Sequence, residues 1–317
     1  MTTSTFPTPT SLSALAAASH AFQLMKRVLF KPFNATRWFG MGFCAWLCSL
    51  GTGGGGGGGG FNFNVKTGKN SFQGIHPEVT SFFNKIVSDP SVRLIVIAIV
   101  AVVFLIIIAF GILFCWLRSR GDFMFLQRAY YPDETIGACW KRAAHPSWSL
   151  FYLRLVYMAV GWVVVLAIAI PMLVYFLVPF IKSGDFLFSP FFALCGAGMV
   201  VAIAWRVLTA FTYDFVVPIM YWNNMPALQA WRVVFSLCAQ HPLSVFVYFI
   251  LMHVWIFLFI SVILLLGVLT CCLGLIILMI PYMGIVAQLP MYLFDRAYSI
   301  YFLTQWRPDL VPAPNPS

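Results

Sequence analysis

The sequence predicts an all-α integral membrane protein with about six transmembrane helices, arranged as three hairpin repeats with interfacial amphipathic helices. The first observation is composition: the 317-residue chain is 61% hydrophobic and only 9% charged, whereas soluble domains carry about 25% charged residues. The second is a series of long apolar runs. The third is an uneven distribution of Lys and Arg between the segments that join these runs. A soluble core could not bury so many apolar side chains, so we expect lipid to surround them.

Apolar runs long enough to cross a bilayer account for five of the six helices. Residues 94–117 form the clearest run, with 24 residues and no charge, where about 20 helical residues suffice to cross the hydrocarbon. Residues 150–180 and 191–217 predict the next two spans. The run 243–290 is too long for one helix, so we expect a hairpin that turns near residues 269–274.

The sixth span, residues 38–50, is short enough to be re-entrant, and the basic residues decide between the two alternatives. If it crosses, 14 of the 19 Lys and Arg residues lie on the N-terminal side of the membrane, and the other five are Lys66, Lys69, Lys85, Arg93 and Lys182. If it does not cross, the division is 9 against 10. Basic residues gather on the cytoplasmic side. We therefore expect six crossings of the cytoplasmic (inner) membrane with both termini in the cytoplasm.

Two amphipathic segments outside these runs predict helices at the membrane surface. In residues 14–30, Phe22, Met25 and Leu29 share one face, which is typical of a helix lying in the cytoplasmic interface. In residues 79–87, apolar side chains recur at helical spacing. We expect this second helix on the outer leaflet or packed over the bundle.

Three pairs of similar dipeptides recur at offsets of 91 to 96 residues and predict an internal repeat. They are Asp122-Phe123 with Asp214-Phe215, Trp140-Lys141 with Trp231-Arg232, and His145-Pro146 with His241-Pro242. We expect three parallel units, each an interfacial helix followed by two crossings, at about residues 14–117, 122–213 and 214–294. The expected organisation is a single membrane domain over 13–305, a glycine-rich extracytoplasmic loop over 51–90, a disordered tail over 1–12 and a C-terminal tail over 306–317.

The glycine run at residues 53–60 resembles a phosphate-binding loop only superficially. The pattern GxxxxGK[ST] needs Ser or Thr after its Lys, whereas Lys69 is followed by Asn70. We therefore expect a flexible tether there and no nucleotide site. The sequence also lacks HExxH, GxSxG and CxxC motifs, and it has only nine acidic residues. These features predict no catalytic residues, no metal site, no cofactor and no nucleic-acid partner.

Polar residues inside the spans are the candidate functional positions, because such groups are costly in lipid. They are His253, Arg206, Asp214 and Gln288. His253 is either a proton carrier or ligand, or an imidazole bonded to a neighbouring helix. Arg206 has to pair, face a cavity or snorkel. Arg154 and the pair Asp295-Arg296 lie near cytoplasmic ends of spans, where we expect snorkelling.

Two stretches, FKPFNATRWFGMGFCAWLCSLGTGGGGGGGGFNF and CWLRSRGDFMFLQRA, resemble a bacterial family of multi-pass membrane proteins without assigned function. That family is similar in layout to the membrane domain attached to some glycerophosphodiester phosphodiesterases. The resemblance covers most of residues 20–305 and implies structure rather than catalysis. The segments between spans, about 40 residues at 51–90 and about 30 at 118–148, are too short for a catalytic barrel.

These observations favour a non-enzymatic scaffold or accessory protein that binds lipid or a membrane protein partner. The alternative is a small-solute transporter or channel. A transporter should have a polar cavity near the middle of the membrane, lined by His253, Arg206 and residues 281–290. A scaffold should have a dry bundle with basic residues facing the cytoplasmic leaflet.

Overall fold

The computed structural model shows an all-helical chain; every regular element in its described part is a helix. The residues that the structure describes are 14–31, 33–50, 89–172, 188–270, 278 and 280–314. The glycine run, the predicted 79–87 helix and the predicted turn at 271–274 therefore lie outside the described residues.

Four helices are long and apolar enough to cross a membrane. They are α4 (Pro90–Tyr130), α6 (Ala144–Met172), the continuous helical segment Leu194–Asn223 that begins within α8 (Phe188–Phe211), and α11 (Pro242–Leu269). The most apolar 18-residue window of each is at most 6% buried. This confirms four of the five predicted apolar spans as helices in their described parts, and their side chains lack a protein environment. A helical span in the second half of the run 243–290 stays a prediction.

The long helix α4 extends past the run that predicted it. It begins as expected, with Asp89 accepting hydrogen bonds from the backbone N–H and the hydroxyl of Ser91. Its 41 residues make it about 60 Å long, twice the thickness of the hydrocarbon. The first half is exposed, whereas the last turns, from Ser119 to Tyr130, are largely buried. One helix thus joins the apolar region to a packed body, where the sequence predicted a break near residue 117.

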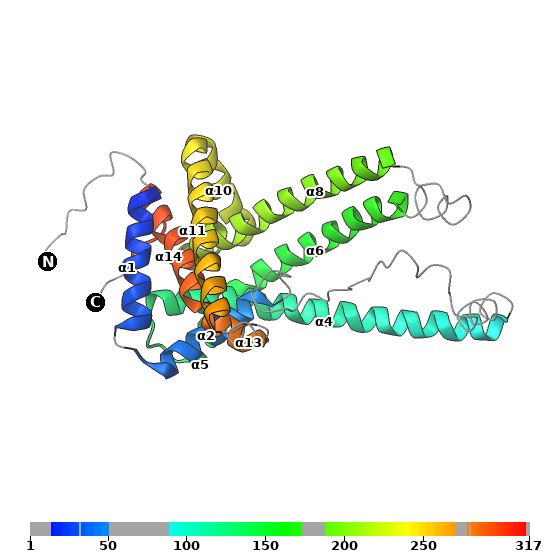
Figure 1. Ribbon diagram of the computed structural model, residues 1–317, viewed down its shortest axis with the longest axis horizontal. Coiled ribbons are helices and arrows are strands. Elements are labelled where there is room, and N and C mark those ends of the chain that lie inside the picture. Colours follow the sequence, from blue (N-terminus) through cyan, green and yellow to red (C-terminus); the bar gives the residue numbers. More distant parts are fainter. Residues whose placement is uncertain are drawn as a thin grey trace, which may run out of the picture.

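The packed body forms where the remaining helices gather around the end of α4. In Figure 1, α4, α6 and α8 project from this body to the right, and α11 runs across their direction. Helix α1 (Ala14–Phe30) packs along α14 (Leu289–Trp306), and α2 (Ala35–Ser49) packs against α4 and α13 (Pro281–Ala287). The first and last described helices, α1 and α14, therefore belong to the body and not to the projecting helices.

Helix α1 matches the predicted bounds of residues 14–30, but its buried face differs from the expected one. Small residues such as Ala17 and Ala21 are fully buried, together with Met25 and Leu29, whereas Phe22 is exposed. Small side chains allow two helix backbones to approach closely. The helix therefore uses its alanine face to pack on α14.

The short helix α2 covers the predicted sixth span. Its 15 residues reach about 22 Å, less than the hydrocarbon thickness of about 30 Å. Asn34 caps its first turn by accepting from the N–H groups of Thr36 and Arg37. The crossing of residues 38–50 therefore stays a prediction.

The remaining helices connect the long ones. They are α5 (Ile136–Arg142), the π-helical turn η2 (Thr212–Val216), α9 (Val217–Asn223) and α10 (Ala227–Gln240). The π-helical turn contains Asp214, and such turns are frequent at functional sites.

Candidate functional site

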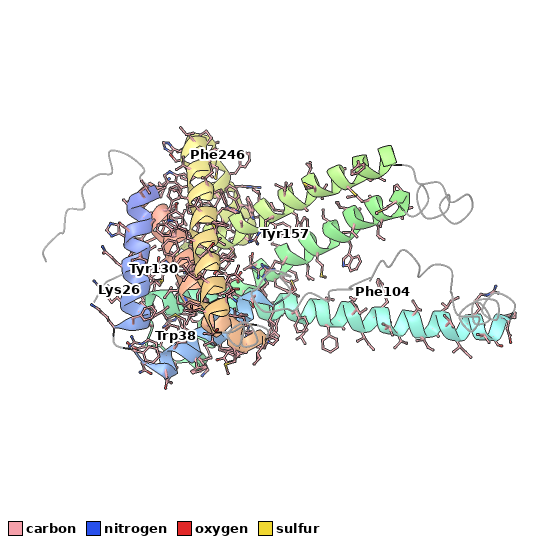
Figure 2. All side chains as sticks on the ribbon, viewed as in Figure 1. Lys26, Trp38, Phe104, Tyr130, Tyr157 and Phe246 are labelled. Atoms are coloured by element: carbon pink, nitrogen blue, oxygen red, sulfur yellow. The ribbon has the colours of Figure 1, made fainter. Side chains whose placement is uncertain are left out.

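A crevice of about 280 Å³ lies where α4, α6 and α8 leave the packed body. Its walls include Gly111 and Phe114 from α4, Met158 from α6 and Trp205 from α8. Trp205 is held in place by Tyr157, with ring centroids 6.0 Å apart. Figure 2 shows Tyr157 close to the point where α6 and α8 leave the body. We call this cavity the crevice.

Polar groups line the end of the crevice that faces the body: Arg118, Arg154, Tyr157, Thr209 and Thr212. The threonine hydroxyls already donate to carbonyl oxygens of their own helix, Thr212 to Leu208 at 2.8 Å and Thr209 to Trp205 at 3.0 Å. Their remaining lone pairs can accept hydrogen bonds, but the two arginines are the only charged groups among the described residues of this lining.

Arg154 is neutralised inside the protein. Its guanidinium forms an ion pair with the fully buried Asp122 of α4 and donates to the hydroxyl of Ser119 at 3.3 Å. The expectation that Arg154 snorkels toward water is therefore wrong. A buried carboxylate on the adjacent helix offers the guanidinium a strong, charge-assisted hydrogen bond, and this replaces the hydration that snorkelling would provide.

Arg118 differs from Arg154 in having no such partner. The structure gives it no hydrogen bond or ion pair among the described residues, and its Nε is buried without an acceptor. Its electrostatic neighbours are Arg154, which repels it, and Asp122, which attracts it. Since Asp122 already pairs with Arg154, the floor of the crevice carries a net charge of one positive unit.

Arg296 lies just beyond the third predicted unit (214–294) and binds both ends of the second unit (122–213). It is fully buried in α14 and donates to the backbone carbonyls of Tyr213 at 2.5 Å and Asp122 at 3.3 Å. Its guanidinium also lies over the ring of Tyr213, 4.4 Å from the centroid. The expectation that Arg296 snorkels is wrong for a similar reason: both of its terminal nitrogens have acceptors inside the body, although its Nε has none among the described residues.

The four positions predicted as functional lie in different surroundings. Asp214 is fully buried, and neither carboxylate oxygen has a hydrogen-bond partner among the described residues. Arg206 is exposed on α8. His253 is exposed on α11 and its Nδ1 lies 2.7 Å from the carbonyl oxygen of Phe249 on the same helix. Gln288 is buried at the junction of α13 and α14.

His253 lies in a second depression, which is almost wholly apolar and lined by side chains of α11 alone. The polar cavity expected of a transporter, joining His253 with Arg206 and residues 281–290, does not correspond to this depression. His253 and Arg206 instead share an electrostatic neighbour, the Asp295 carboxylate in the second turn of α14.

The Asp295 carboxyl group makes the stability of the body depend on pH. Burial raises its pKa from 3.8 to about 6, against the opposing charges of Arg296, Arg206 and His253. A carboxyl whose pKa is raised in the folded state stabilises the fold when protonated. This contribution is complete below about pH 3.8 and is lost as the pH rises to about 6.

We expect Asp295→Asn, which mimics the protonated group, to gain stability relative to the wild type as the pH rises from about 4 to about 7. The measurement is the unfolding temperature of the detergent-purified protein at each pH. Asp309→Asn is the control, because Asp309 is exposed and Arg307 lowers its pKa, so the sign should be opposite and the effect small. If the difference in unfolding temperature between Asp295→Asn and the wild type does not change with pH, the raised pKa of Asp295 is contradicted.

Sequence reasoning missed Arg118, Ser119 and Asp122 as parts of a site. Residues 118–148 were expected to lie between two spans, and nothing in the pattern showed that α4 continues through residues 118–130. A usable signal was present in the charge density: the segment 118–122 holds three of the chain's 28 charged residues directly after a 24-residue run with none.

The fold and this site together define a class: an all-helical protein with apolar helices suited to a membrane and a body that buries ionic residues. The chain belongs to a family of unknown function (DUF7544), whose model matches residues 12–304. A search of curated proteins and a search of solved structures gave no match. The likeness to membrane domains of glycerophosphodiester phosphodiesterases therefore stays an expectation from the sequence.

Proposed function

We propose that this protein is a non-enzymatic scaffold or accessory component of the bacterial inner membrane that binds lipid or a membrane protein partner. The observation that carries the proposal is the exposure of α4, α6, α8 and α11, whose apolar windows are 0 to 6% buried. Apolar surface of this extent requires lipid or other membrane helices to cover it. In Figure 2, Phe104 lies on the projecting part of α4, away from the body.

The proposed topology has six crossings in three hairpin units, with both termini in the cytoplasm. The packing of the helices before each hairpin supports it: α5 contacts α4, α10 contacts η2, and α1 contacts α14. Helices α5 and α10 thus each pack on the end of the preceding unit. Helix α1, which precedes the first hairpin, packs on α14, which follows the last one. Helix α11 runs across the direction of the other long helices (Figure 1). The proposed topology therefore requires α11 to change its orientation so that it also crosses the bilayer. Burial of its 28 apolar-rich residues in lipid would favour this change.

The experiment is purification of the full chain from membranes in native lipid particles, followed by identification of the retained lipids and proteins. We expect retained phospholipid in fixed ratio to the protein. Recovery of a soluble, lipid-free monomer from cells without detergent would contradict the proposal.

A small-solute transporter is the second candidate, and the buried carboxylate of Asp214 favours it. Both oxygens of this group are unpartnered among the described residues, and the hydroxyl of Tyr248 and the Asp295 carboxylate are its electrostatic neighbours. Buried carboxylates in membrane proteins often carry protons or ions. Proton-driven solute flux in proteoliposomes that Asp214→Asn abolishes would establish this candidate over the first.

A further inference from the structure

We propose that the crevice between α4, α6 and α8 binds the phosphate headgroup of an anionic phospholipid, with Arg118 as its counter-charge. The inference rests on the proposed function, because it places these three helices in the bilayer with the packed body on the cytoplasmic side. It adds the class of lipid and the residue that selects it.

The charge balance of the crevice provides the first argument. Arg154 and Asp122 neutralise one another, whereas Arg118 has no partner among the described residues. An arginine within a membrane helix is costly without a counter-charge. Guanidinium groups bind phosphate oxygens through two parallel hydrogen bonds, and basic sites between membrane helices on the cytoplasmic side bind anionic headgroups.

The direction of the crevice provides the second argument. Its polar floor, at Arg118 and Thr212, lies at the body end of the helices, and its apolar walls extend outward to Gly111 and Trp205. Seven residues of helix separate Arg118 from Gly111, a distance of about 10 Å. A phospholipid of the cytoplasmic leaflet has the same polarity: its phosphate lies on the cytoplasmic side and its acyl chains run toward the middle of the membrane.

The size of the crevice provides the third argument. A volume of about 280 Å³ lies just below the range for small-molecule sites, about 300–1,000 Å³, and it suits a headgroup better than a whole lipid. The acyl chains would follow the exposed apolar surface of α4 beyond the crevice, where Ile107 and Phe110 are about half exposed.

The test is native mass spectrometry of the full chain in detergent, titrated with phosphatidylglycerol and, separately, with phosphatidylethanolamine carrying the same acyl chains. We expect the wild type to prefer phosphatidylglycerol and Arg118→Gln to bind it about tenfold more weakly, which corresponds to about 1.4 kcal/mol. Arg118→Lys should bind phosphatidylglycerol with an affinity between these two, because the positive charge remains but the paired hydrogen bonds of the guanidinium are lost.

Arg120→Gln is the matched control. It removes one positive charge two residues away, but the Arg120 guanidinium contacts the rings of Trp116 and Trp140, at 4.8 and 4.5 Å from their centroids, and does not line the crevice. We expect its affinity for phosphatidylglycerol to equal that of the wild type. Size-exclusion elution and unfolding temperature establish that each variant is folded. If Arg118→Gln does not fold, Arg118→Lys takes its place in the comparison with Arg120→Gln.

Three outcomes would overturn the inference: equal affinity of the wild type and Arg118→Gln, equal losses in Arg118→Gln and Arg120→Gln, or no preference between the two lipids. Inorganic phosphate distinguishes the two sources of the anion. If free phosphate binds in the absence of lipid and an excess displaces phosphatidylglycerol, the site is one for a soluble anion and the lipid assignment fails. Each of these outcomes leaves the proposed function standing if phosphatidylethanolamine is still retained in fixed ratio.

Discussion

Replacing Arg154 by methionine is expected to destabilise the protein by about 3–5 kcal/mol, because it leaves the Asp122 carboxylate buried without its partner. Asp122 is fully buried, and its ion pair with Arg154 joins α4 to α6 at the edge of the packed body. Asp122→Asn should have a smaller effect of the same sign, since an amide can still accept one hydrogen bond from the guanidinium. The measurement is the free energy of unfolding in detergent.

The double variant Asp122→Asn, Arg154→Met separates the ion pair from simple loss of packing. With no charge left in the pair, we expect most of the stability lost in Arg154→Met to return. Arg93→Met, at the exposed beginning of α4, serves as the control and should change stability by no more than about 0.5 kcal/mol. A double variant that is as unstable as Arg154→Met would show that the charge of Asp122 is not the cause.

Replacing Gly121 by alanine is expected to destabilise the protein by about 1–3 kcal/mol, because the added methyl group has no space. A Cβ at this position would lie 2.7 Å from the backbone N of Cys48 and the carbonyl C of Leu47. Backbone atoms cannot turn away as a flexible side chain can, so α2 would have to move off α4. Unfolding temperature and the solvent accessibility of the Cys48 thiol, which is buried in the wild type, both report this separation.

Gly111→Ala is the matched control for Gly121→Ala. Both glycines lie in α4, but a Cβ at position 111 would have Met158 Sδ, at 3.9 Å, as its nearest neighbour. This variant should be neutral or gain up to about 1 kcal/mol from the better helix propensity of alanine. Equal stability of the two variants would contradict the close contact between α2 and α4.

The apolar helices could be predicted from the sequence because each is determined by its own composition. Residues 94–117 form a helix in any arrangement that removes them from water, since a helix satisfies its backbone hydrogen bonds internally. The amphipathic pattern of residues 14–30 likewise predicted the bounds of α1. The buried face of α1 was predicted less well. Hydrophobicity favoured the face with Phe22, whereas only a small side chain such as that of Ala21 fits against α14.

The buried ionic contacts could not be predicted, because each depends on tertiary packing. Arg154 and Asp122 are separated by 32 residues, and Arg296 donates to a carbonyl 174 residues away. Snorkelling was the reasonable expectation for an arginine near a helix end, and a partner on an adjacent helix reverses it. The absence of a partner for Arg118 among the described residues follows from the same packing, since Asp122 is already paired with Arg154.

The internal repeat could be predicted from the sequence, but the structure tests it only in part. The paired dipeptides placed Asp122 and Asp214 at equivalent positions, and the structure buries both. The equivalence of the helices around them belongs to the proposed topology, because residues 51–88, 173–187 and 271–277 lie outside the described part of the chain.

The central claim is that α4 crosses the membrane with the packed body in the cytoplasm, and cysteine accessibility at its two ends tests this most directly. Ser91→Cys lies at the exposed beginning of α4, and Gly137→Cys lies just beyond its other end, where an added side chain meets no atom within 4 Å. In intact bacterial spheroplasts, an impermeant thiol reagent should label Cys at position 91 and should label position 137 only after the membrane is permeabilised. Labelling of both positions in intact spheroplasts, or of position 137 alone, would contradict the account.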